Sequence, residues 1–188
     1  MGDEASVQLA IRDFCKASEI QPHAPDVHAL LGRAYHQQAR LEQKLGHNDR
    51  AQQLQARSDD AFQRATQLSM SNNLELAAVL LHLGMTKIHD GQFREAIAEF
   101  SQAIGIRPHC LHQRFNRANA YHALGMDQYA LQDLEILATQ FPGYRRALHL
   151  RNQLMKKCAV RHAQEESWPM GLASALPLPP IEEIEEKE

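Results

Sequence analysis

Apolar residues recur at helical spacing along most of this chain, in segments that alternate with turn residues. One such segment has its apolar residues three and four positions apart, at Phe93, Ala96, Ile97, Phe100, Ala103 and Ile104. Between segments of this kind stand Gly46, Gly91 and Gly125, and glycine suits the left-handed turn that ends a helix. The pattern predicts an all-α chain built from pairs of helices joined by short turns.

The helical segments also recur at a fixed distance. Four Ala-x-x-x-Phe-like pairs are each followed, eight residues after the second member, by one of the stop residues Pro22, Met70, Pro108 and Pro142. The last two stops are 34 residues apart, and the earlier intervals, 38 and 48 residues, exceed this period by 4 and 14. A fixed period of this length indicates a stacked array, in which each unit buries its apolar face against its neighbours.

The second unit is longer than the others. Its interval from Tyr35 to Phe62 is 27 residues, against 13 from Tyr121 to Leu134, and the excess is divided equally before and after the turn at Gly46. Two more turns per helix lengthen this hairpin by about 10 Å, at about 1.5 Å per residue, so we expect its tip to project. The segment 74–83 is apolar nearly all round, and we expect it to be the most buried helix.

The sequence marks Leu31-Gly32-x-x-Tyr35, Ala96-x-x-x-Phe100 and Pro108 resemble those of the tetratricopeptide repeat family, whose unit is a helix-turn-helix of about 34 residues. The resemblance implies a short right-handed α-solenoid. It also implies this division of the chain: a partial repeat with only a second helix at 1–22, a repeat with both helices extended by two turns at 25–70, repeats at 74–108 and 109–142, a capping helix at 143–166, and a disordered Pro- and Glu-rich acidic tail at 167–188.

Composition and charge narrow the classes of protein to consider. The longest apolar run, 76–81, is six residues, whereas a membrane span needs about 20. The three cysteines are far apart and form no disulfide framework, which predicts a reducing, cytoplasmic location. A net charge of -3 and 6% aromatic residues supply neither a surplus of cations for phosphates nor a stacking platform for bases. We therefore expect a protein or peptide partner, with no nucleic acid and no membrane.

The sequence offers only weak signals for metal binding or catalysis. The tightest histidine group is His109-Cys110-x-His112, which stands at a helix start without a second ligand pair at zinc spacing. The sequence contains no Gly-rich phosphate loop, nucleophile elbow or Cys/His pair in a recognisable setting. We predict a non-enzymatic protein with no cofactor and no metal site.

The resemblance also implies a partner-binding groove, because in this family the first helix of each pair lines a concave surface that takes a peptide or a partner helix. We expect Leu81, Met85 and Phe115 to form an apolar groove floor and the polar positions to fix the register of the partner. In the register of the repeats, the residues facing the groove are Asp26, Arg33, His36, Leu81, Met85, His89, His112, Phe115, Asn119 and His122, together with Ala29 and Ala78.

One subgroup of the family grips the terminal carboxylates of heat-shock chaperones with Lys, Asn and Arg at set groove positions. The pairs at those positions here include Ala29/Arg33 and Leu81/Met85, so we predict that the two-carboxylate clamp is absent and that a chaperone tail is not the ligand. The leading hypothesis is a protein-interaction module or scaffold. The alternative is a structural subunit or fragment of a larger repeat assembly, docked through its ends and the long hairpin.

A further hypothesis concerns regulation. The segment 181–188 has a net charge of -4, whereas the last predicted helix is rich in Arg and Lys. The tail could therefore fold back and compete with an acidic partner, with a modest effect because exposed ion pairs are weak and screened by salt.

Overall fold

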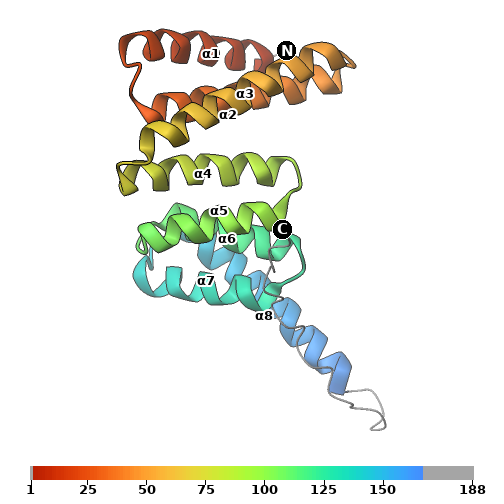
Figure 1. Cartoon of the computed structure of the whole chain (residues 1–188). Helices are drawn as coiled ribbons and strands as arrows, with labels where there is room; N and C mark the ends of the chain where they lie inside the picture. Colours follow the sequence, from red (N-terminus) through yellow and green to blue (C-terminus); the bar gives the residue numbers. More distant parts are fainter. Residues whose placement is uncertain (1, 167–188) are drawn as a thin grey trace, which may run out of the picture.

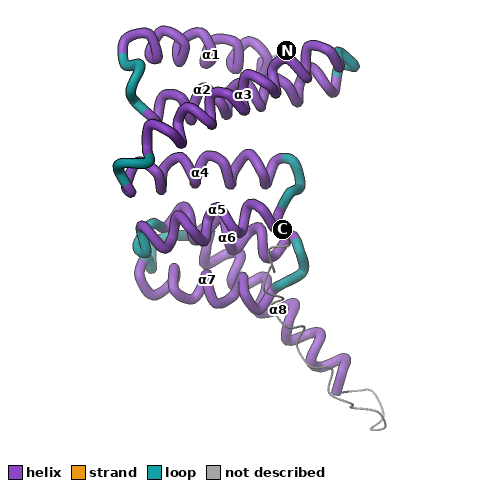
Figure 2. Tube along the Cα trace, in the orientation of Figure 1, coloured by secondary structure: helices purple, strands orange, loops and turns teal. Residues whose placement is uncertain are grey.

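The computed structural model describes residues 2–166, with side chains from residue 4 to residue 160. This part of the chain folds into helices joined by short turns (Figures 1 and 2). The helices are α1 (Gly2–Ile20), α2 (Pro25–Lys44), α3 (Asn48–Ser69), α4 (Asn73–His89), α5 (Phe93–Ile106), α6 (Leu111–Ala123), α7 (Asp127–Gln140) and α8 (Arg145–Glu166). The tail predicted at 167–188 lies outside the described residues.

The helices pack in consecutive pairs. α2 lies against α3, α4 against α5, and α6 against α7, while α1 packs on α2 and α8 on α7. The first helices of the pairs also touch one another in order, α2 against α4 and α4 against α6. The stack runs through the whole described chain (Figure 1) and confirms the predicted all-α solenoid of helix pairs.

Local sequence explains where the helices begin and end. Gly46, Gly91 and Gly125 have φ values of 82°, 75° and 74°, the left-handed conformation in which glycine closes the first helix of each pair. Pro25 occupies the first turn of α2, where its missing N–H costs nothing. The Asn72 side chain accepts a hydrogen bond from the Leu74 amide at 3.0 Å and caps α4.

A glycine and a phenylalanine set the spacing of α4 and α5. Phe100 is fully buried, and a Cβ added at Gly84 would lie 2.5 Å from the Phe100 Cε1 atom. The same contact recurs in the preceding pair, where a Cβ at Gly32 would lie 2.9 Å from the ring of Phe62. The missing side chain therefore lets the two helices of a pair approach closely, as interior packing requires.

Alanine at Gly84 should destabilise the protein, whereas alanine at Gly105 should not. The added Cβ at Gly84 meets the buried Phe100 ring, and we expect the free energy of unfolding to fall by about 1 to 3 kcal/mol. Gly105 of α5 has no neighbouring atom within 4 Å of an added Cβ, so its alanine should stabilise by up to about 1 kcal/mol through helix propensity. Urea unfolding of both variants measures the difference; equal stabilisation would contradict the close approach.

The second pair is longer than the others. α2 and α3 have 20 and 22 residues, against 13 and 14 in α6 and α7, and their tip reaches past the ends of the neighbouring helices (Figure 1). Buried Leu54 packs within this hairpin. Close to the tip the buried Glu42 carboxylate accepts a hydrogen bond from His47 Nδ1 at 2.8 Å and forms an ion pair with Arg50 Nε at 3.2 Å. These contacts make the added length an ordered part of the fold.

The expectation that segment 74–83 is the most buried helix is wrong. α4 has five buried residues and its Leu74 side chain is 61% exposed, whereas α2 has ten buried residues. Part of the reason is the extended hairpin, because α2 packs on α3 along its added length, where Gln38, Ala39 and Glu42 are buried.

Candidate partner-binding site

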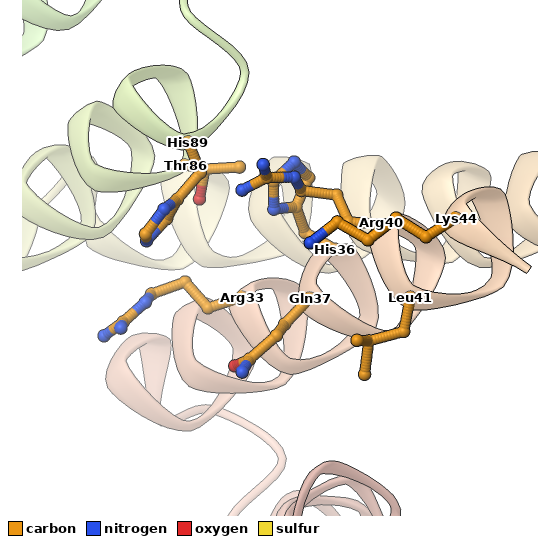
Figure 3. A pocket seen from close by; sticks show the side chains of 8 residues that line it. All are labelled: Arg33, His36, Gln37, Arg40, Leu41, Lys44, Thr86 and His89. Carbon is orange, nitrogen blue, oxygen red and sulfur yellow. The ribbon is translucent and has the colours of Figure 1, made fainter. Parts of the chain in front are cut away.

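A cavity of about 460 Å³ lies between the C-terminal half of α2 and the end of α4. Its α2 residues are three or four positions apart and so share one face of the helix. The Thr86 and His89 side chains of α4 face them across the cavity (Figure 3). The lining consists of Arg33, His36, Gln37, Arg40, Leu41, Lys44, Thr86 and His89, and we call this cavity the basic groove.

The charge of the basic groove comes from Arg33, Arg40 and Lys44, with no carboxylate in its lining. Arg33 Nη1 donates a hydrogen bond to Nδ1 of His82 at 3.1 Å. Because arginine only donates, His82 accepts and is neutral. Burial lowers the pKa of Arg33, and burial together with the charge of Arg33 lowers the pKa of His82 to about 4.

Two further histidines stand beside these cations. His36 is buried, and its Nε2 donates to Asp90 Oδ1 at 2.7 Å, which ties α2 to the residue following α4. Burial and then the nearby Arg40 lower the pKa of His89, which favours its neutral form. The neutral ring can donate one hydrogen bond and accept another.

A second cavity, of about 640 Å³, lies between α6 and α8. Phe115 and Asn119 line its α6 side, and the α8 side includes Arg145 and Arg146, again with no carboxylate. The Phe115 ring meets the ring of Tyr144 edge to face, with centroids 5.2 Å apart. This cavity therefore combines an aromatic surface with two cations.

The two cavities open on equivalent faces of their helices. Arg33 of α2 and Asn119 of α6 occupy the same position in the repeat register, and each lines its cavity. Between α2 and α6 the equivalent α4 position is Met85. The two cavities therefore stand at the same position of the repeat register, on the first and the last of the three first helices.

The orientation of α8, and hence of the second cavity, depends on Asp127. Its buried carboxylate accepts a hydrogen bond from His122 Nδ1 of α6 at 2.8 Å and forms an ion pair with Lys157 Nζ of α8 at 2.7 Å. Burial acts to raise the pKa of Asp127, but the hydrogen bonds from Lys157 and His122 outweigh it and hold the pKa below its usual value. The ionised carboxylate thus links three helices.

Five of the predicted groove residues come together at the two cavities. Arg33, His36 and His89 line the basic groove, and Phe115 and Asn119 line the second cavity.

The other predicted positions lie elsewhere. Leu81 and Met85 are half-buried and pack against the core cluster of Ala96, Phe100 and Ala120, so much of their apolar surface serves the fold. His122 pairs with Asp127, while Asp26 and His112 are exposed and line neither cavity. Ala29 is fully buried in the cluster with Phe62. The lining of the basic groove is consequently polar, where an apolar floor was expected.

Sequence reasoning missed the residues that give the basic groove its charge. Arg40 and Lys44 continue the helical spacing of Arg33 and His36 along α2. The repeat register ends near His36 in a unit of ordinary length, so it does not cover the extended part of the helix. Continuing the spacing through the extension would have found both cations.

Comparison with known proteins adds to this geometry. Residues 77–110 match a family described as tetratricopeptide repeat. The chain also resembles a solved structure described as the crystal structure of MamA, with 17% sequence identity and a TM-score of 0.53 over 87% of this chain and 92% of that chain. Residues 77–110, which span most of α4 and all of α5, thus match one tetratricopeptide repeat, and the stacked helix pairs around them have the fold of a solenoid of such repeats. The likeness to the solved structure shows the fold alone.

The repeat matched at residues 77–110 is of a kind that generally serves protein–protein interaction and is typically non-catalytic. A search of curated proteins found no match. Within residues 2–166, no helix is long and apolar enough to span a membrane. The same part of the chain contains no group of three or more His, Cys, Asp or Glu side chains placed to hold a metal ion.

Proposed function

We propose that this protein is a non-enzymatic scaffold that binds an extended peptide, or a helix, of a partner protein along the face of α2, α4, α6 and α8 where the two cavities open. The observation that carries the proposal is the shared character of these cavities. They stand at equivalent register positions, and each is lined by arginines without a carboxylate. Such surfaces are suited to a partner that brings the complementary charge.

The second cavity supplies the apolar part of the proposed binding face. The Phe115 ring, supported by Tyr144, supplies an apolar anchor, and Asn119 beside it is already held by its hydrogen bond to the Phe115 carbonyl at 3.0 Å. The exposed parts of Leu81 and Met85 extend the apolar contact toward α2. Polar contacts from the other predicted groove residues fix the register of the partner.

Phe115→Ala should weaken peptide binding in a chain that still folds, with some loss of stability because the ring also packs against the core cluster of Ala118 and Leu134. A peptide selected by display against the full chain supplies the ligand, and we expect its Kd to rise about tenfold, or about 1.4 kcal/mol, on loss of the aromatic anchor. Fluorescence anisotropy measures Kd, and the thermal midpoint reports the fold. Tyr129→Ala on α7, which removes another partly exposed ring, is the matched control. An unchanged Kd for Phe115→Ala, or an equal loss in the control, would contradict the proposal.

A second candidate function is that of a structural subunit in a larger repeat assembly. It is favoured by α1, where Leu9 and Ile20 are 50% and 78% exposed while Val7 is buried against the stack. Sedimentation velocity distinguishes the two: a mass that rises with concentration supports the structural subunit, and a monomer that binds a short peptide supports the scaffold.

The proposal involves no cofactor, no metal, no nucleic acid and no membrane. A chaperone tail remains an unexpected ligand, since Ala29 is buried and offers no carboxylate-binding group. The cytoplasmic location stays a prediction from the three cysteines.

A further inference from the structure

We propose that the basic groove is the receptor for an extended acidic segment of the partner, about six residues long, whose carboxylates pair with Arg33, Arg40 and Lys44. This inference rests on the proposed function and names the chemistry of the partner at one end of the binding face. Neither the family match nor the structural likeness assigns such a site.

The first argument is charge without compensation. The arginines between α6 and α7 are paired: Arg114 Nη1 and Arg117 Nη2 lie 3.1 and 2.8 Å from Asp133 Oδ1. In the basic groove, by contrast, Arg33 is half-buried and donates to a neutral histidine. No carboxylate among the described residues pairs with Arg33, Arg40 or Lys44. A partly desolvated cation without a counter-ion is unfavourable, and a carboxylate from a ligand would relieve that cost.

The second argument is the length of the cation row. Seven residues of helix separate Arg33 from Arg40, or about 10.5 Å along the axis, and Arg40 and Lys44 are about 6 Å apart. A single phosphate or carboxylate covers only part of this row. An extended chain advances about 3.3 Å per residue and turns every second side chain to the same face, so acidic residues at alternate positions over about six residues follow the row. The occupant is therefore a stretch of peptide.

The third argument is the rest of the lining. Gln37 and the neutral His89 can hydrogen-bond a peptide backbone, and Leu41 offers an apolar contact between the charged side chains. Arg40 and Lys44 belong to the part of α2 beyond His36, which exists only because this hairpin is extended. The extension therefore adds a recognition surface that a unit of ordinary length lacks.

The test uses the full chain and fluorescein-labelled peptides. The probe carries glutamates at its first, third and fifth positions among alanines, and a matched peptide carries glutamine instead. We expect the glutamate peptide alone to bind, with a Kd that rises as salt screens the ion pairs. In the variant Arg33→Gln/Arg40→Gln/Lys44→Gln the Kd should rise at least about tenfold.

Two further variants keep the test independent of folding defects. Lys16→Gln/Arg94→Gln/Arg107→Gln removes the same charge from exposed positions elsewhere, and its Kd should match that of the wild type. Arg40→Glu/Lys44→Glu leaves the contact between Arg33 and His82 in place and should abolish binding. If the glutamate peptide binds the groove variants as tightly as the wild type, the proposal is overturned.

The remaining outcomes separate this inference from the proposed function. If the glutamine peptide binds as well as the glutamate peptide, acid recognition is wrong while the peptide-binding scaffold stands. If no displayed peptide binds at all, both fall. If inorganic phosphate displaces the probe at the same concentration as the unlabelled peptide does, the groove binds a single anion. The proposal of an extended peptide segment is then overturned. If only a variant with glutamine at Glu182, Glu183, Glu185, Glu186 and Glu188 binds the probe, the chain's own tail is the occupant and the partner claim is overturned.

Discussion

Replacing Phe100 with alanine should lower the free energy of unfolding by about 3 to 5 kcal/mol, the cost of emptying a phenylalanine site in a packed core. Phe100 is fully buried, and its cluster joins Ala96 of its own helix to Ala120 of α6. Its ring also lies against Gly84 of α4. The substitution therefore leaves a cavity where three helices meet. Urea unfolding followed by circular dichroism measures the loss.

A double-mutant cycle with Gly84→Ala tests the geometry behind this expectation. In the wild type the added methyl group meets the Phe100 ring and destabilises. In the Phe100→Ala background the ring is gone, so the same change should stabilise α4 by up to about 1 kcal/mol. Equal effects in the two backgrounds would show that Gly84 and Phe100 do not meet as the structure has them.

The second large effect is a loss of stability on acidification, with His82 as its source. Burial and the charge of Arg33 lower the pKa of His82 from 6.5 to about 4. Since the folded pKa lies below the unfolded one, the unfolded chain takes up the proton first as the pH falls. The stabilising contribution is complete above about pH 6.5 and is lost progressively between that pH and about pH 4. At about 1.4 kcal/mol per pKa unit, the loss amounts to about 3 kcal/mol.

The variant His82→Gln isolates this contribution. Glutamine keeps an acceptor for Arg33 Nη1 and has no proton to gain in this range. The free energy of unfolding of the variant should therefore fall by about 3 kcal/mol less than that of the wild type between pH 6.5 and pH 4. His149→Gln, at an exposed position of α8, is the control and should leave the pH profile unchanged. Identical profiles for His82→Gln and the wild type would contradict the assignment.

The sequence was sufficient for the fold because its evidence is local. Amphipathic spacing, the turn glycines and the fixed period each depend on residues close together in the chain, and the stack then follows from burying every apolar face. The 27-residue interval from Tyr35 to Phe62 likewise anticipated the length of α2 and α3. Relative burial was harder to predict, because it depends on how closely α2 and α3 pack along the added length of their hairpin.

The site was predicted only in part, because its character depends on contacts between distant residues. The hydrogen bond from Arg33 to His82 joins positions 49 apart, and the bond from His36 to Asp90 joins positions 54 apart. A helical pattern indicates which side of α4 carries Leu81 and Met85. It does not show how much of these two side chains packs against the core cluster that contains Phe100.

Hydrogen-exchange mapping of the full chain, with and without a tightly bound display-selected peptide, tests the central claim most directly. We predict that the peptide slows exchange in α2, α4, α6 and the first half of α8, which line the two cavities, and leaves the backs of the pairs, α3, α5 and α7, unchanged. Protection confined to α3, α5 and α7, or to α1 alone, would contradict the account.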